Sequence, residues 1–126
     1  MEKAHFEQAK LWLKAAEYIT KEDNKEAYAV GVAMVVHAVI KANDALTVKF
    51  MQKTARRHDE ARMLFEELIK KGAIKPEYSK HKQTIQDAIS QKARAEYRIS
   101  YFSKKDYEDL RRNADKFIKM VSEVVS

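Results

Sequence analysis

The stretch "VVHAVIKANDAL", residues 35 to 46, places four polar side chains inside the most apolar part of the chain. At 100° per residue, the apolar positions around it gather on one broad side of a helix. These positions are Val32, Val35, Val36, Val39, Leu46 and Phe50. The sequence therefore predicts a long helix whose main face is buried in a core.

Three of the polar residues, His37, Lys41 and Asp44, have the spacing i, i+4 and i+7, which lines them up on one edge of that helix. One interpretation is structural: Lys41 pairs with Asp44, and His37 donates to a nearby carbonyl or tyrosine. The other is functional: this edge, together with Asn43, lines a groove. The spacing is compatible with both interpretations.

Small residues form a further face of the same helix. They are Ala27, Gly31, Ala38, Ala42 and Ala45. Glycine in a helix interior costs about 1 kcal/mol relative to alanine, so Gly31 indicates that another helix approaches closely and offsets this loss. That helix belongs either to the same chain or to a second copy in a homodimer.

The composition favours an all-α protein. The chain has 126 residues with only two glycines and one proline, and it is rich in helix formers. Its length fits one domain, residues 1–126, and the lack of cysteine excludes disulfides and thiolate chemistry. We expect an up-and-down bundle of four to five helices, with successive helices antiparallel because the connections are short.

The expected helices follow from apolar periodicity and capping residues. The first spans about residues 3–20, with an inner stripe of Ala4, Leu11, Ala15, Tyr18 and Ile19 that Trp12 and Ala16 widen. The second runs from about 25 to 51, capped by Asp23 or Asn24. The third starts at 59–60 and ends at Gly72, the fourth runs from Pro76 to about 97 with His81 in its inner stripe, and the fifth follows the "SKKD" capping box at 103–106. The inner stripe of the fifth comprises Tyr107, Leu110, Ala114, Phe117, Ile118, Val121 and Val125.

The formal charge of +6 modestly favours attraction to phosphates. The longest charge-free apolar run, residues 27–40, is shorter than the roughly 20 residues that a bilayer-spanning helix needs. The N-terminus has no signal-peptide pattern. We expect a soluble, cytoplasmic protein without a membrane partner.

Three segments, "HAVIKANDAL", "RRHDEARMLFEEL" and "YFSKKDYEDLRRNADKFIKMV", resemble the HEPN domain superfamily, above all its small stand-alone prokaryotic members. The resemblance implies a four- or five-helix bundle, usually homodimeric, that cleaves RNA or binds nucleotides, often beside a minimal nucleotidyltransferase. Ribonuclease members carry Arg, four to six residues, then His. Here that motif is not intact: Lys53, rather than an arginine, precedes His58 at this distance.

The loop after the second helix carries the candidate catalytic residues. His58 would act in acid–base chemistry, with Arg57 and Lys53 holding phosphate; a solvated basic loop is the alternative. The candidate ligand-binding residues are His37, Lys41, Asn43, Asp44, Arg56 and Arg62. A second basic set with interleaved aromatic residues comprises Lys92, Arg94, Arg98, Lys104, Lys105, Arg111 and Arg112 with Tyr97, Tyr101 and Phe102.

A di-iron bundle needs Glu-x-x-His on two helices, and only Glu2 to His5 fits, so we expect no metal or other cofactor. Binding of RNA or a nucleotide, with a nucleotidyltransferase as a partner, is the leading hypothesis for the function. Two alternatives stand beside it: a metal-independent, toxin-like ribonuclease with a degenerate motif, and a structural dimer or adaptor.

Overall fold

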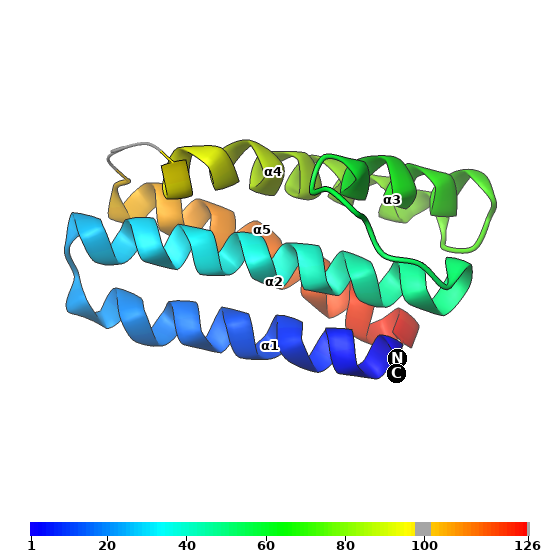
Figure 1. Ribbon diagram of the computed structural model, residues 1–126, viewed down its shortest axis with the longest axis horizontal. Helices are drawn as coiled ribbons and strands as arrows, with labels where there is room; N and C mark the ends of the chain where they lie inside the picture. The colour runs from blue at the N-terminus through cyan, green and yellow to red at the C-terminus, as the bar shows by residue number, and fades with distance from the viewer. Residues whose placement is uncertain (98–101, 126) are drawn as a thin grey trace.

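The computed structural model describes residues 1–97 and 102–125, which fold into a bundle of five α-helices (Figure 1). The helices are α1 (Glu2–Ile19), α2 (Lys25–Met51), α3 (Glu60–Lys70), α4 (Lys82–Tyr97) and α5 (Lys104–Val125). Two 3₁₀ segments, η1 (Thr20–Glu22) and η2 (Pro76–His81), precede α2 and α4. The described residues contain no strand, and the predicted all-α bundle is confirmed.

The helix ends lie close to the predicted positions because they are determined by local capping. The Asn24 side chain accepts a hydrogen bond from the Ala27 amide over 2.8 Å. Ser103 and Asp106 each accept from the backbone N–H of the other over 3.0 Å, which is the reciprocal capping box. One detail differs: Pro76 opens η2, and α4 begins only after this 3₁₀ segment.

The helix α2 is the centre of the bundle. It runs antiparallel to α1 and parallel to α5 (Figure 1). Two contacts show that α2 and α5 are parallel. Gly31 lies against Tyr107 near the start of both helices, and the Lys49 ammonium donates to the Val124 carbonyl over 2.6 Å near their ends. Both chain termini therefore lie at the same end of the molecule (Figure 1).

The helix α3 departs from the expected antiparallel order. Segment 52–59 runs back along α2, so α3 begins beside the middle of α2 and continues in the same direction (Figure 1). The Asn43 amide donates to the Ala61 carbonyl over 3.0 Å at this point. A returning segment of this length, at about 3.3 Å per extended residue, reaches the middle of α2. The helix pair α3 and α4 then covers the opposite side from α1.

The small-residue face of α2 packs inside the same chain. A Cβ atom on Gly31 would lie 2.5 Å from Thr20 Cγ2 and 3.0 Å from Tyr107 Cε1. The predicted close approach is therefore real, but η1 and α5 of this chain make it. A homodimer built through this face loses its main support.

The predicted inner stripe of α1 is only partly correct: Ala16 is buried and Trp12 packs against the core, but Leu11 and Tyr18 face outward. Leu11 and Tyr18 are 63% and 73% exposed, whereas Ala9 and Ala16 are fully buried. Small side chains at the contact let α1 lie close to α2, so the larger apolar residues of the other stripe face outward. The side chains that pack beside the two buried alanines are Phe6, Trp12 and Leu13.

By length and composition α2 could cross a membrane, contrary to the expectation from its charge-free run alone. An 18-residue window of α2 has a mean hydropathy of 1.4. However, 67% of that window is buried among the other helices, as in the core helix of a soluble protein. The structure is compatible with a soluble protein.

Candidate functional site

The polar edge of α2, defined by His37, Lys41 and Asp44, receives residues from two other segments. The His37 ring stacks on Trp12 of α1, with centroids 4.8 Å apart and an interplanar angle of 25°. The ring of His58, from segment 52–59, meets His37 edge to face at 6.3 Å and 89°. All three rings are half-buried. Two histidines that are distant in the sequence therefore share one site.

Asp44 lies further along the same edge and is only 6% exposed. Burial raises the pKa of its carboxyl group, although the charges of His5 and Lys41 and the backbone amide of Ala55 act to lower it. Its Oδ1 atom is buried without a hydrogen-bond partner in the described part of the chain. Lys41 and Asp44 influence each other electrostatically, but the ion pair expected between them does not form.

Asn43 has a structural role. Its side chain is completely buried, and its amide holds the Ala61 carbonyl at the start of α3. The backbone amide of Ala55, at the middle of the returning segment, acts on the Asp44 carboxylate and lowers the pKa of that group. The Asn43 bond holds the end of segment 52–59 against α2, and His58 on that segment lies at His37. A ligand has no access to the Asn43 amide.

The three candidate catalytic residues point in different directions. The ring of His58 turns inward to His37. The Arg57 guanidinium is 75% exposed and pairs with Asp59 at 3.4 Å and Glu60 at 3.6 Å. Lys53 lines a hollow of about 480 Å³ at the other end of the segment. Among these three, only His58 belongs to the ring cluster at the polar edge.

The hollow at Lys53 lies between the start of α1 and the end of α2, and His5 forms part of its wall. His5 also acts electrostatically on Asp44, so it connects the hollow with the polar edge. In the sequence, the only pattern that includes His5 is the incomplete Glu-x-x-His spacing. An antiparallel contact between two helices brings it here, and no spacing within one helix indicates this position.

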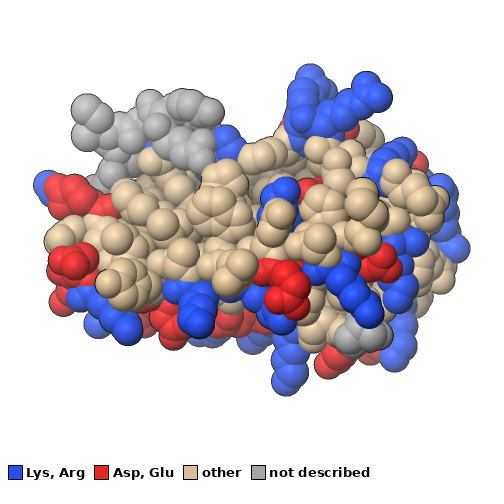
Figure 2. Space-filling view, turned by 60° about the horizontal axis from the view of Figure 1, so that its bottom comes forward, with Lys and Arg blue, Asp and Glu red and all other residues tan. Residues whose placement is uncertain are grey.

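The remaining cations of the candidate site differ in their availability for a ligand. Arg62 pairs with Glu66 at 3.3 Å. The Arg56 backbone donates to Glu60 over 3.3 Å, and its guanidinium is in no ion pair within residues 1–97 and 102–125. Figure 2 shows Lys and Arg side chains gathered over the end of the molecule at which α2 ends. This end is the most basic surface in that view.

The second basic set is largely neutralised by its own helix. Lys105 and Arg112 both pair with Asp109, at 2.6 Å and 3.2 Å. Phe102 is 1% exposed and lies under the Arg94 guanidinium at 4.2 Å, so it closes the core. Arg98, Tyr101 and the side chain of Tyr97 lie outside the described residues. This set is a weaker candidate than the polar edge of α2.

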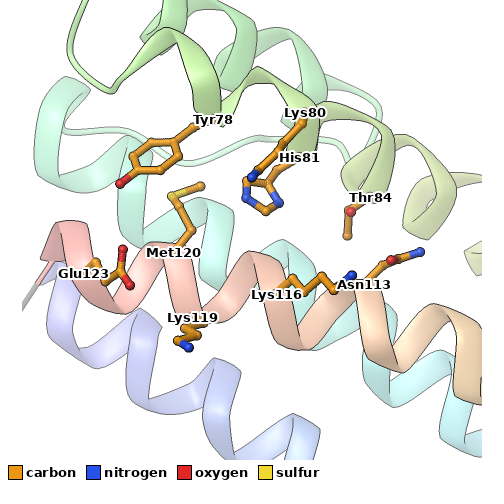
Figure 3. A pocket seen from close by; sticks show the side chains of 9 residues that line it. All are labelled: Tyr78, Lys80, His81, Thr84, Asn113, Lys116, Lys119, Met120 and Glu123. Atoms are coloured by element: carbon orange, nitrogen blue, oxygen red, sulfur yellow. The ribbon is translucent and has the colours of Figure 1, made fainter.

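A second histidine site lies at His81, which the sequence predicts only as part of the inner stripe of the fourth helix. His81 is indeed 8% exposed, but it also lines a cleft of about 430 Å³ between η2 and α5 (Figure 3). Lysines from both segments line the same cleft. The apolar periodicity around His81 hid this site, because a buried stripe and a cleft wall have the same spacing.

No group of three or more His, Asp or Glu side chains in the described residues could hold a metal ion. No model of a known protein family matches the chain, and no curated protein matches it either.

Proposed function

We propose that the protein binds RNA or a nucleotide along the polar edge of α2 and segment 52–59. The observation that carries the proposal is the meeting of Trp12, His37 and His58, three rings from three segments, beside a basic end of the molecule. Nucleic-acid binding without sequence preference combines aromatic surfaces for bases with cations for phosphates. The resemblance to the HEPN superfamily points to the same class of ligand.

Two cations suit the phosphate part of such a ligand. Lys53 and Arg56 are exposed, and neither side chain is in an ion pair within the described part of the chain. An unpaired ammonium or guanidinium exchanges only water and counterions for phosphate, and releasing counterions favours binding. Arg57 and Arg62 already have carboxylate partners, so they would contribute less.

Metal-independent ribonuclease activity is the second candidate function, and the contact between His37 and His58 favours it. Cleavage of RNA needs one group that takes a proton and another that gives one. Two imidazoles at 6.3 Å can divide these roles, with Lys53 or Arg56 near the phosphate. The resemblance adds a homodimer, a minimal nucleotidyltransferase partner and a cytoplasmic location to the proposal.

A labelled single-stranded RNA pool, incubated with the protein without added metal, tests both functions. The double variant Lys53→Gln/Arg56→Gln should weaken RNA retention and reduce its salt dependence. The variant Lys14→Gln/Lys70→Gln has the same charge change on α1 and α3 and should retain RNA as the wild type does. His58→Ala should abolish any cleavage.

Equal retention by the two double variants would mean that binding follows net charge alone, and the proposed surface would be wrong. If the wild type neither retains nor cleaves RNA, and also binds no nucleotide in the same buffer, a structural or adaptor role replaces the proposal.

A further inference from the structure

The cleft between η2 and α5 is a second place where the fold concentrates polar groups (Figure 3). It is open to solvent and has a volume of about 430 Å³, within the range of small-molecule sites. One wall comes from η2 and the first turn of α4, and the other from the part of α5 between Asn113 and Glu123. Its lining residues are Tyr78, Lys80, His81, Thr84, Asn113, Lys116, Lys119, Met120 and Glu123.

His81 is the buried polar group of this cleft. The side chain is 8% exposed, with Phe117 at 5.8 Å and Tyr78 at 6.4 Å between ring centroids. Its ring contacts are aromatic, and it forms no hydrogen bond within the described part of the chain. The ring projects into the cleft (Figure 3). A buried imidazole without a hydrogen-bond partner has a donor and an acceptor to offer to a ligand.

Two lysines, one from each wall, line the cleft together with His81 (Figure 3). Burial lowers the pKa of His81, and the charges of Lys80 on η2 and Lys116 on α5 lower it further, so both ammonium groups act on this ring. Neither lysine is in an ion pair within residues 1–97 and 102–125. Two exposed, unpaired cations and a neutral imidazole therefore line one cleft, where a bound anion would replace the water and counterions around the ammonium groups.

We propose that the cleft binds an organic phosphate monoester, such as a nucleoside monophosphate, with its phosphate group between Lys80, Lys116 and His81. The two ammonium groups supply positive charge, and the imidazole N–H donates to a phosphate oxygen. This site is separate from the polar edge of α2 and does not depend on RNA binding there.

The other end of the cleft suits the organic part of such a ligand. Tyr78 and Met120 form an apolar wall, and Glu123 lies beside them with its carboxylate toward Tyr78 (Figure 3). A carboxylate accepts hydrogen bonds from sugar hydroxyl or base amino groups, and it repels a second phosphate. A phosphate group alone would leave this end of the cleft empty, so a monoester fills it better than inorganic phosphate.

The test is a titration followed by the NMR signals of the His81 imidazole in the full chain. The probes are adenosine monophosphate, ribose phosphate, inorganic phosphate and adenosine. Saturable shifts with both phosphate esters, weaker shifts with inorganic phosphate and none with adenosine are expected. Because the anion stabilises the protonated ring, the pKa of His81 should rise when a phosphate ester is bound.

The variant Lys80→Gln/Lys116→Gln removes both cations from exposed positions, so the fold should remain intact, as a thermal melt can verify. The double variant should bind adenosine monophosphate more than about tenfold more weakly than the wild type, because it lacks two charge-assisted contacts. Lys14→Gln, an exposed change on α1, should bind like the wild type. No saturable shift with any ester, equal affinity in the double variant, or equal shifts with adenosine would overturn the proposal.

Discussion

The amide of Asn43, fully buried in α2, donates a hydrogen bond to the backbone oxygen of Ala61 over 3.0 Å. This contact joins the most apolar helix to the start of α3 and holds the end of the segment that carries His58. Together with the interaction between Asp44 and Ala55, it explains the polar residues within "VVHAVIKANDAL": Asn43 and Asp44 shape the backbone that brings His58 to His37.

Replacing Asn43 with leucine should destabilise the protein by about 1–3 kcal/mol, since the buried bond that joins α2 to the Ala61 carbonyl would be lost. Urea denaturation measures this loss. Hydrogen exchange should accelerate first in α3, because the bond anchors its first turn. Gln8→Leu, at an exposed position of α1, is the control and should change little. Uniform acceleration over all five helices would contradict an anchoring role.

Asp44→Asn should raise the melting temperature at neutral pH. Burial raises the pKa of Asp44 in the folded state, so the charged carboxylate opposes folding at neutral pH, and folding becomes more favourable as the pH falls through the raised pKa. The amide of asparagine removes the charge and keeps an acceptor for Ala55. The difference between variant and wild type should shrink in acid. A lower melting temperature for the variant at neutral pH would show that the charges of His5 and Lys41 outweigh burial.

Gly31→Leu should destabilise the fold by about 1–3 kcal/mol through overpacking. The new side chain would collide with Thr20 and Tyr107 from its first atom onward. The neighbouring Val30→Leu, at a position that is 46% exposed, is the matched control. Thermal melts and the oligomeric state of both variants check the contact. An unchanged melting temperature for Gly31→Leu would rule the close packing out.

His81 should make the protein less stable as the pH falls. Its pKa in the folded state lies below the ordinary value because of burial and the charges of Lys80 and Lys116, so the unfolded chain takes up the proton more readily. The contribution of neutral His81 to the stability of the folded state is complete above the ordinary histidine pKa and is lost as the pH drops below it. The melting temperatures of the wild type and His81→Gln, measured between about pH 8 and about pH 5, should become more similar as the pH falls. A constant difference between the two melting temperatures over this pH range would contradict the destabilising effect of His81 protonation.

The predicted helix limits agree with the structure where the signals are local. Asn24, Ser103 and Asp106 cap the backbone within three residues of themselves, so the sequence contains everything that their geometry requires. The inner face of α5 was predicted correctly for the same reason, because its single apolar stripe leaves only one way to bury it. The buried members of that stripe are Tyr107, Leu110, Ala114, Phe117, Ile118, Val121 and Val125.

The face of α1 was harder to predict, because this helix has two apolar stripes of similar strength. Leu11 and Tyr18 are larger than Ala9 and Ala16, yet the alanines are the buried pair. Close approach of two helix backbones favours small side chains at the contact, and this preference depends on the neighbouring helix. The hydrophobicity of one helix does not contain that information.

The helical class, the ends of the helices and the burial of α2 can be predicted from the amino-acid sequence, because propensity, capping and periodicity act within a few residues. The direction of α3, the contact of His58 with His37, and the shared cleft of Lys80, Lys116 and His81 depend on how the helices pack. These relationships join residues from different helices. They follow from packing and buried hydrogen bonds across the bundle, for which the spacing of residues within one helix carries no signal.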